Sequence, residues 1–211
     1  MHKYVIMGPQ GSGKGTQAKL LKEELNLTHI SVGDIFRWHV QTHTKLAARI
    51  KRLIDAGNLV PDEIVEEIVE TRLKEHDWNY GFILDGFPRN PEQAEFFLES
   101  YDIDAVIYID VPERVTIERA LARRVCGSCG LDYNLIFHRP EKPDTCDVCG
   151  GHLIARADDN EEALRKRLDA FSSKTLPALE LFDTKELVYR IDGTLDRDAV
   201  YADIRDKLGL T

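Results

Sequence analysis

The chain has 211 residues, and its 28 lysines and arginines stand against 37 aspartates and glutamates, which gives a formal net charge of −9 with histidine neutral. This charge excludes a generic nucleic-acid binder, which usually presents a strongly basic surface. With 43% hydrophobic and 31% charged residues, the composition is that of a soluble globular protein with a sizeable core. Any phosphate that the protein binds must therefore be held by local structure.

The predicted elements alternate between short apolar runs and longer amphipathic stretches. Strands are expected at residues 4–7, 28–31, 82–84, 105–109 and 187–191, and helices at residues 17–25 and after Pro61, Pro112 and Asn160. This alternation predicts an α/β fold with a five-stranded parallel sheet flanked by helices. The first strand leaves no space for a signal peptide, and no segment is long and apolar enough to span a bilayer, so we expect a cytoplasmic protein.

A glycine-rich loop at residues 8–16 reads Gly-Pro-Gln-Gly-Ser-Gly-Lys-Gly-Thr, between the first strand and the first helix. This is the setting of a P-loop, in which backbone N–H groups, a helix N-terminus and Lys14 hold phosphates. Gly15 stands where most P-loops carry the hydroxyl that binds Mg²⁺, and Thr16 comes one residue later. We therefore expect nucleotide oxygens and water to hold most of the magnesium. A glycine-rich turn without a ligand is the alternative interpretation.

Two segments interrupt the alternation of strands and helices. Residues 31–60, the helical insertion, show helical patterns but no strand. Residues 122–159, the cysteine-rich segment, are rich in Gly, Cys, Pro and Asp and are too short and polar to form a core of their own. The core domain is then expected to comprise residues 1–30, 61–121 and 160–211.

A second polar motif, Asp85-Gly86-Phe87-Pro88-Arg89, follows the third predicted strand. Ligands of open parallel sheets bind beyond the carboxyl ends of the strands, where this motif falls. Asp85 is suited to orient water on a magnesium ion, and Arg89 to hold a phosphate with its two-pronged guanidinium. Taken alone, these residues also fit an ordinary turn.

Four cysteines, Cys126, Cys129, Cys146 and Cys149, form two C-x2-C pairs separated by residues 130–145. This pattern is typical of a closed tetrahedral zinc site with a structural role. Zinc binding would supply the folding free energy that the cysteine-rich segment lacks. Two disulfides, or iron in a site of the same shape, are the alternatives.

The phosphate loop followed by Asp85 to Arg89 resembles the adenylate kinases, the family that interconverts ATP plus AMP with two ADP. The resemblance covers essentially the whole chain and includes Ser31-Val32-Gly33-Asp34, Asp55-Ala56-Gly57, Arg123-Arg124, Arg156-Ala157-Asp158-Asp159, Arg165-Lys166-Arg167 and Asp192-Gly193-Thr194. It implies a P-loop kinase fold with a helical NMP-binding insertion and a zinc-ribbon-like lid. It also implies reversible phosphoryl transfer from Mg-ATP to AMP, in the service of adenine nucleotide homeostasis.

The resemblance also implies the residues of two nucleotide sites. ATP-binding residues would be Gly11, Ser12, Gly13, Lys14, Gly15, Thr16, Arg119, Arg123, Asp132 and Tyr133, the last two near the adenine. AMP-binding residues would be Val32, Arg37, Asn58, Leu59, Val60, Gly86, Phe87, Pro88, Arg89, Gln93, Arg156 and Arg167. Catalytic roles would fall to Lys14, Asp85, Arg89, Arg123, Arg156 and Arg167.

Within the implied AMP site, Arg37 and Arg89 would hold the phosphate, and the amide of Gln93 would meet the adenine edge. Val32 departs from the pattern, because many relatives carry a threonine there whose hydroxyl faces the base. We therefore expect looser base discrimination, with AMP still the preferred acceptor.

The arginines have a physical reason, because ATP and AMP phosphates repel each other and fixed cations must bring them together. An ionised AMP phosphate is already a nucleophile and needs no general base. Two alternatives stay open: a kinase for another nucleoside monophosphate, and a zinc-ribbon module that uses nucleotide as a switch or binds nucleic acid. The second is disfavoured by the few basic residues between the cysteine pairs. We expect a monomer that binds ATP, AMP and ADP but neither nucleic acid nor membranes.

Overall fold

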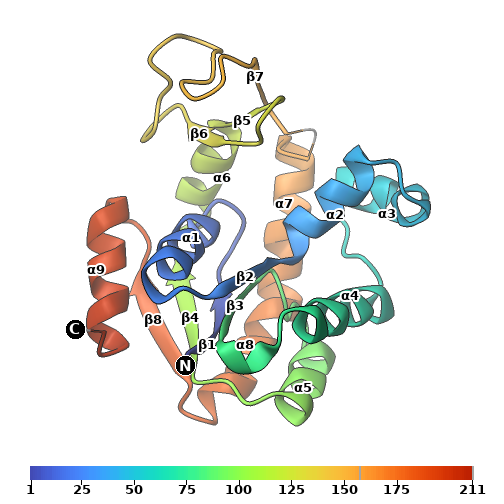
Figure 1. Cartoon of the computed structure of the whole chain (residues 1–211), viewed down its shortest axis with the longest axis vertical. Helices are drawn as coiled ribbons and strands as arrows, with labels where there is room; N and C mark the ends of the chain where they lie inside the picture. The colour runs from blue at the N-terminus through green and yellow to red at the C-terminus, as the bar shows by residue number, and fades with distance from the viewer. Residues whose placement is uncertain (157, 211) are drawn as a thin grey trace.

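A parallel sheet of five strands forms the centre of the computed structural model, which describes residues 1–156 and 158–210 (Figure 1). Ala157, which belongs to one of the motifs above, and Thr211 lie outside the described residues. The strands are β1 (Lys3–Met7), β2 (Thr28–Ser31), β3 (Phe82–Asp85), β4 (Ala105–Asp110) and β8 (Val188–Asp192), in the order β2-β3-β1-β4-β8. All neighbouring strands run parallel. The predicted sheet is confirmed, and each predicted strand agrees with the observed one to within one residue at either end.

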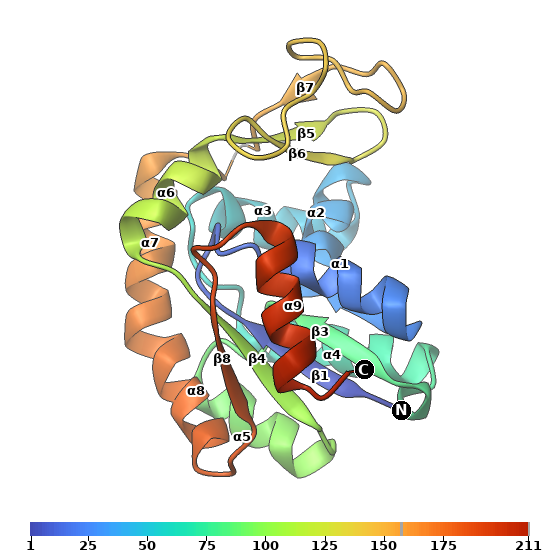
Figure 2. The same ribbon diagram turned by 90° about the vertical axis from the view of Figure 1, so that its left-hand side faces the viewer.

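Helices cover both faces of this sheet. They are α1 (Lys14–Leu25), α4 (Asp62–Glu75), α5 (Pro91–Ser100), α6 (Glu113–Leu121), α7 (Glu161–Ala170), α8 (Leu176–Asp183) and α9 (Arg197–Lys207), with a 3₁₀ turn η1 (Trp78–Tyr80) and a π-helical turn η2 (Phe171–Thr175). Successive side chains of a strand point to opposite faces, so Tyr4 and Ile6 pack with α1 and α9, whereas Val5 and Met7 pack on the side of α4, α5 and α8. Figure 2 shows α9 in front of the sheet. None of the described helices is long and apolar enough to cross a membrane.

The helical insertion consists of α2 (Val32–Gln41) and α3 (Lys45–Asp55). Each helix begins at a side-chain cap, because the Ser31 hydroxyl accepts from the Asp34 N–H and the Thr44 hydroxyl from the Ala47 N–H. Buried residues of both helices belong to the same apolar cluster as β1, β3 and α5. The insertion is therefore packed directly onto the core of the protein.

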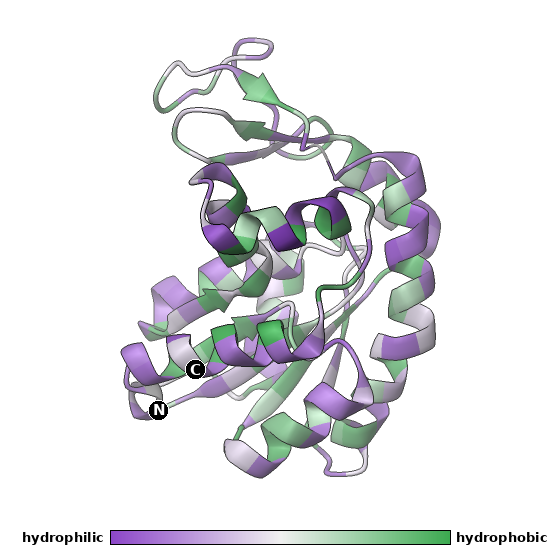
Figure 3. Cartoon of the chain, turned by 90° about the vertical axis from the view of Figure 1, so that its right-hand side faces the viewer, coloured by the Kyte–Doolittle hydropathy of each residue, from purple (hydrophilic) through white to green (hydrophobic). Residues whose placement is uncertain are grey.

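The cysteine-rich segment forms a small antiparallel sheet of β5 (Arg123–Cys126), β6 (Asp132–Asn134) and β7 (Leu153–Ile154), in the order β6-β5-β7. In Figure 1 it lies beyond α6 and α7, at the end of the molecule farthest from α5. Among its described residues, the buried cluster consists of Cys126, Tyr133, Cys146 and Leu153. Figure 3 shows that its loops are mostly hydrophilic or neutral. These features match the predicted zinc-ribbon-like lid.

Candidate active site

The glycine-rich loop joins the end of β1 to the first turn of α1. A Cβ at Gly11, whose φ is +87°, would lie 2.4 Å from the carbonyl oxygen of Thr116, so no other residue fits there. The loop is closed by a hydrogen bond of 3.2 Å from the Ser12 N–H to the Pro9 carbonyl. Helix α1 begins after Gly13 without a side-chain cap. Its first N–H groups are therefore available to an anion.

Lys14 is the cation of this loop, and its Nζ donates to the Pro9 carbonyl at 3.3 Å. Burial lowers the pKa of Lys14 to about 8. Arg89, Arg123 and Arg37 act in the same direction, whereas Asp85 opposes them. Because the ammonium lies among other cations, a bound phosphate would stabilise its charged form.

Asp85 stands at the end of β3, opposite the loop, where a Cβ on Gly15 would lie 3.4 Å from its Oδ2. Burial tends to raise the pKa of Asp85, but His29 and Lys14 outweigh this effect and hold it below its usual value. The nearest His29 nitrogen is 3.8 Å from Oδ2. The other oxygen, Oδ1, is buried and has no hydrogen-bond partner among the described residues. A free carboxylate oxygen beside a phosphate loop fits the hydration shell of a magnesium ion.

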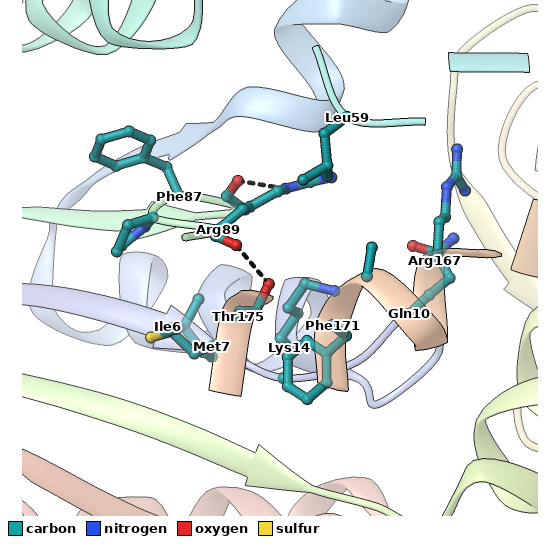
Figure 4. Close-up of a pocket in the computed structure, with 14 residues that line it drawn as sticks. Ile6, Met7, Gln10, Lys14, Leu59, Phe87, Arg89, Arg167, Phe171 and Thr175 are labelled. Carbon is teal, nitrogen blue, oxygen red and sulfur yellow. Dashed lines mark hydrogen bonds between the residues drawn. The ribbon is translucent and has the colours of Figure 1, made fainter. Parts of the chain in front are cut away.

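Arg89 lines two neighbouring pockets and is fixed from three sides. Its Nε donates to the Gly86 carbonyl at 2.8 Å, its backbone N–H donates to Gln93 Oε1 at 2.8 Å, and its carbonyl accepts from the Thr175 hydroxyl at 2.9 Å. Figure 4 shows the first and third of these contacts, with Lys14 and Arg167 nearby. Burial and the charge of Arg167 lower the pKa of Arg89 to about 10. Its guanidinium is therefore held in a fixed position without a carboxylate partner in the described part of the chain.

Four further arginines converge on the same region, and each is paired with an aspartate. The pairs are Arg37–Asp34, Arg123–Asp159 at 2.5 Å, Arg156–Asp132 at 2.6 Å and Arg167–Asp158 at 2.8 Å. Arg89 differs from them, because no described carboxylate lies within ion-pair distance of its guanidinium. Arg167 also donates to the Ile54 carbonyl at 3.1 Å, which links α7 to the helical insertion.

A pocket between the helical insertion and the core brings together most of the predicted AMP-side residues. Its lining includes Val32, Arg37, Asn58, Leu59, Val60, Gly86, Arg89, Gln93 and Arg167. A neighbouring pocket, lined in part by Lys14, Phe87 and Pro88, connects this region to the phosphate loop (Figure 4). The structure therefore brings apolar side chains, several arginines and the glycine-rich loop together around two neighbouring pockets.

Arg119, Asp132 and Tyr133, which are predicted to lie on the ATP side, each make different contacts in the structure. Arg119 donates to the Gly193 carbonyl at 2.6 Å and lies 4.9 Å from the ring centre of Phe137. Asp132 accepts from Lys19 at 3.0 Å as well as from Arg156. Tyr133 is only 2% exposed, and its hydroxyl lies within the cysteine-rich segment, where it donates to Cys146 Sγ and accepts from the Asp147 N–H.

The four cysteines meet in one cluster. All four Sγ atoms lie within 4.8 Å of one another, with Cys126 and Cys149 at 3.4 Å and Cys129 and Cys146 at 3.6 Å. Zn–S bonds of 2.3 Å in a tetrahedron require S–S separations of about 3.8 Å. All four are free thiols, so the alternative of two disulfides does not hold. A hydrogen bond from Tyr133 contributes most to lowering the pKa of Cys146, to about 6. The cluster therefore fits a tetrahedral metal ion.

Sequence reasoning missed Asp62, Thr175 and His29. Asp62 has the position of an ordinary acidic residue at the start of a helix, and its partners Asn90 and Gln93 lie 28 and 31 positions away along the chain. Thr175 belongs to the π-helical turn η2, which no pattern of apolar residues announces. Such turns occur frequently at functional sites, but they are recognised only in the structure.

The parallel sheet that ends in a phosphate loop, with a ring of arginines around a second pocket, defines a P-loop kinase that acts on nucleotides. The adenylate kinase family model matches residues 6–187 of the chain. Adenylate kinases of Methanocella arvoryzae, Clostridium tetani and Thermotoga maritima are 46%, 44% and 44% identical to it. These alignments cover 96%, 97% and 99% of this chain and 96%, 97% and 98% of the relatives. The chain belongs to the adenylate kinase family, as its motifs predict.

Proposed function

We propose that the protein transfers the γ-phosphoryl group of Mg-ATP reversibly to AMP and so forms two molecules of ADP. The observation that carries this proposal is the position of Arg89, between the phosphate loop and the pocket that contains Gln93. A phosphate held there would face a second phosphate held by Lys14. This is the arrangement that an in-line transfer between two nucleotides requires.

On the ATP side, the loop from Gly11 to Thr16 would hold the phosphates through its N–H groups and Lys14. Arg119 would lie along the base, and Arg123 would reach the phosphates. Asp132 and Tyr133 would border this site through the cysteine-rich segment, and the buried position of the Tyr133 ring limits it to a backbone contact. Magnesium bound to ATP neutralises phosphate charge, and Asp85 would orient its water ligands.

On the AMP side, Arg37 and Arg89 would bind the phosphate, and Arg156 and Arg167 would reach the group being transferred. The base would lie against Val32 and the segment Asn58 to Val60, with the Gln93 amide on its polar edge. Gly86, Phe87 and Pro88 would form the wall between base and phosphate. These cations would stabilise the transition state, because negative charge is spread over the oxygens of the phosphoryl group that is being transferred.

The helical insertion (residues 31–60) and the cysteine-rich segment (residues 122–159) would close over the core formed by residues 1–30, 61–121 and 160–211. Closure would exclude water and protect ATP from hydrolysis. The cysteine cluster would hold a structural zinc ion, since four thiolates complete the shell and leave no position for substrate. We expect a cytoplasmic monomer without nucleic-acid or membrane partners, a state that size-exclusion chromatography with light scattering would check.

A coupled steady-state assay with Mg-ATP and each of AMP, GMP, CMP and UMP tests the proposed acceptor. A dominant rate with AMP is expected, and a higher kcat/KM with a pyrimidine nucleotide would favour the other monophosphate kinases instead. Lys14→Met should lower kcat by about 10²- to 10³-fold, because a preset cation at the phosphates is lost. Lys22→Met, on the exposed side of the same helix, is the matched control. A near-normal kcat in Lys14→Met, with an unchanged circular dichroism spectrum, would contradict the assignment.

A further inference from the structure

Behind the Gln93 side chain lies a carboxylate that does not line the pocket itself. Asp62, the first residue of α4, accepts a hydrogen bond of 2.7 Å from Gln93 Nε2 through Oδ1 and one of 2.8 Å from Asn90 Nδ2 through Oδ2. Asn90 in turn caps α5, because its Oδ1 accepts from the Gln93 N–H at 2.8 Å. One carboxylate therefore connects the beginnings of two helices.

These contacts determine which way the Gln93 amide points. The Arg89 backbone N–H can only donate, so it requires the amide oxygen, and the Asp62 carboxylate can only accept, so it requires the amide nitrogen. Turning the amide by half a rotation would set donor against donor and acceptor against acceptor. Because Gln93 is 2% exposed, water would not compensate for the lost bonds. The amide therefore has one orientation.

An amide with one orientation distinguishes purines that differ at position 6. After these two hydrogen bonds, Nε2 of Gln93 still has one N–H to donate and Oε1 still has one lone pair to accept, and the two lie side by side. Adenine presents an acceptor at N1 beside a donor at N6, whereas guanine and hypoxanthine present a donor at N1 beside an acceptor at O6. An amide that was free to rotate could satisfy either pattern.

We propose that Asp62 is a specificity-determining residue, which fixes the Gln93 amide so that the pocket accepts adenine and rejects 6-oxopurines. The proposal rests on the proposed function, in which AMP is the acceptor and Gln93 meets its base. Asp62 acts as a positioning residue, since it reaches the base only through Gln93. Its role is enlarged by Val32, whose apolar side chain adds no hydrogen bond to the base pocket.

The test compares AMP with inosine monophosphate, which reverses the donor and acceptor at N1 and position 6. Asp62→Ala should lower the ratio of kcat/KM for AMP over that for inosine monophosphate by about tenfold, as expected for one discriminating hydrogen-bond pair. The KM for ATP should stay unchanged. Glu63→Ala is the matched control, because it removes an exposed carboxylate from the same first turn of α4 and should leave the ratio unchanged. If Asp62→Ala does not fold, Asp62→Asn keeps the shape, replaces one acceptor by a donor and should move the ratio in the same direction.

A double-mutant cycle separates positioning from general damage. In a Gln93→Ala background, Asp62→Ala should change the ratio no further, because the group through which it acts is gone. An unchanged ratio in Asp62→Ala, or an equal fall of both kcat/KM values, would overturn this inference while leaving the proposed function intact. A wild-type protein that uses inosine monophosphate as well as AMP would overturn the proposed acceptor specificity and this inference with it.

Discussion

The helical insertion and the cysteine-rich segment, which flank the active site, are attached to the core by different kinds of contact. The helical insertion buries Val32, Phe36 and Ile50 in the apolar cluster that also contains residues of the central sheet. The cysteine-rich segment has a separate cluster of two cysteines, a tyrosine and a leucine, and it meets the core through polar contacts. Two of these contacts are Lys19 with Asp132 at 3.0 Å and Gln10 with Asp159 at 3.2 Å.

Stability therefore has a different source in each of the two segments beside the active site. Apolar burial ties the helical insertion to the folding of the whole core, since its side chains complete the same cluster. The cysteine-rich segment has little apolar burial of its own, so the proposed zinc ion on its four cysteines would order it, and polar contacts hold it against the core. A perturbation of one segment should therefore leave the other largely unaffected.

The largest effect is expected from removal of the proposed zinc ion. Structural zinc contributes about 10–16 kcal/mol of apparent binding free energy in small zinc domains, far more than a cluster of four side chains supplies. Chelation, or Cys146→Ser, should unfold the cysteine-rich segment, seen as rapid proteolysis within residues 122–159 and an early thermal transition. The central sheet should keep its main transition. Simultaneous loss of both transitions would show that the two regions fold as one unit.

A smaller effect, confined to the other segment, is expected from Ile50→Ala. Ile50 is fully buried in α3, and such truncations cost about 2–5 kcal/mol through lost burial and the cavity that remains. Urea denaturation should show this loss as a lower midpoint of the main transition, with the proteolysis of residues 122–159 unchanged. Arg49→Ala, at the exposed neighbouring position, provides the control and should change the midpoint little.

The two segments are expected to differ in how strongly their arginines affect the pKa of Lys14. As the pH rises through about 8, Lys14 loses its proton, so kcat/KM for ATP should decline, by about tenfold per pH unit beyond the pKa. Of the charges that lower this pKa together with burial, Arg123 comes from the cysteine-rich segment and Arg37, with a smaller effect, from the helical insertion. An NMR titration of isotopically labelled lysine should give a larger pKa increase in Arg123→Ala than in Arg37→Ala. A larger pKa increase in Arg37→Ala would mean that the helical insertion has the stronger electrostatic effect on Lys14.

The smallest effect is expected from Lys19→Met. Lys19 and Asp132 are 50% and 38% exposed, and exposed ion pairs contribute less than about 1 kcal/mol. The variant should weaken the contact between the cysteine-rich segment and α1 and change Tm little. Because a salt-sensitive ion pair is lost, the rate of proteolysis in this segment should depend less on salt concentration than in the wild type. Lys22→Met should behave as the wild type. A loss of several degrees in Tm would mean that this contact is part of the folding core.

The sheet, the glycine-rich loop and the cysteine cluster were predictable, because each depends on neighbours in the sequence. Strand patterning locates β1, the order of strand, glycines and helix identifies the loop, and the C-x2-C spacing selects four ligands. The carboxylate partners were not predictable, since Arg123 and Asp159 are 36 positions apart and Gln93 and Asp62 are 31 positions apart. Such pairings depend on how helices are placed around the sheet, which local patterns do not encode.

The paired arginines have a consequence for nucleotide binding. Aspartates pair with the guanidinium groups of Arg37, Arg123, Arg156 and Arg167. If these arginines bind phosphate as proposed, an incoming phosphate would replace a carboxylate, and a departing phosphate would allow the ion pair to form again. The free energy of each step would then be a difference between two similar interactions, which would keep a site with several cations from binding its product too tightly.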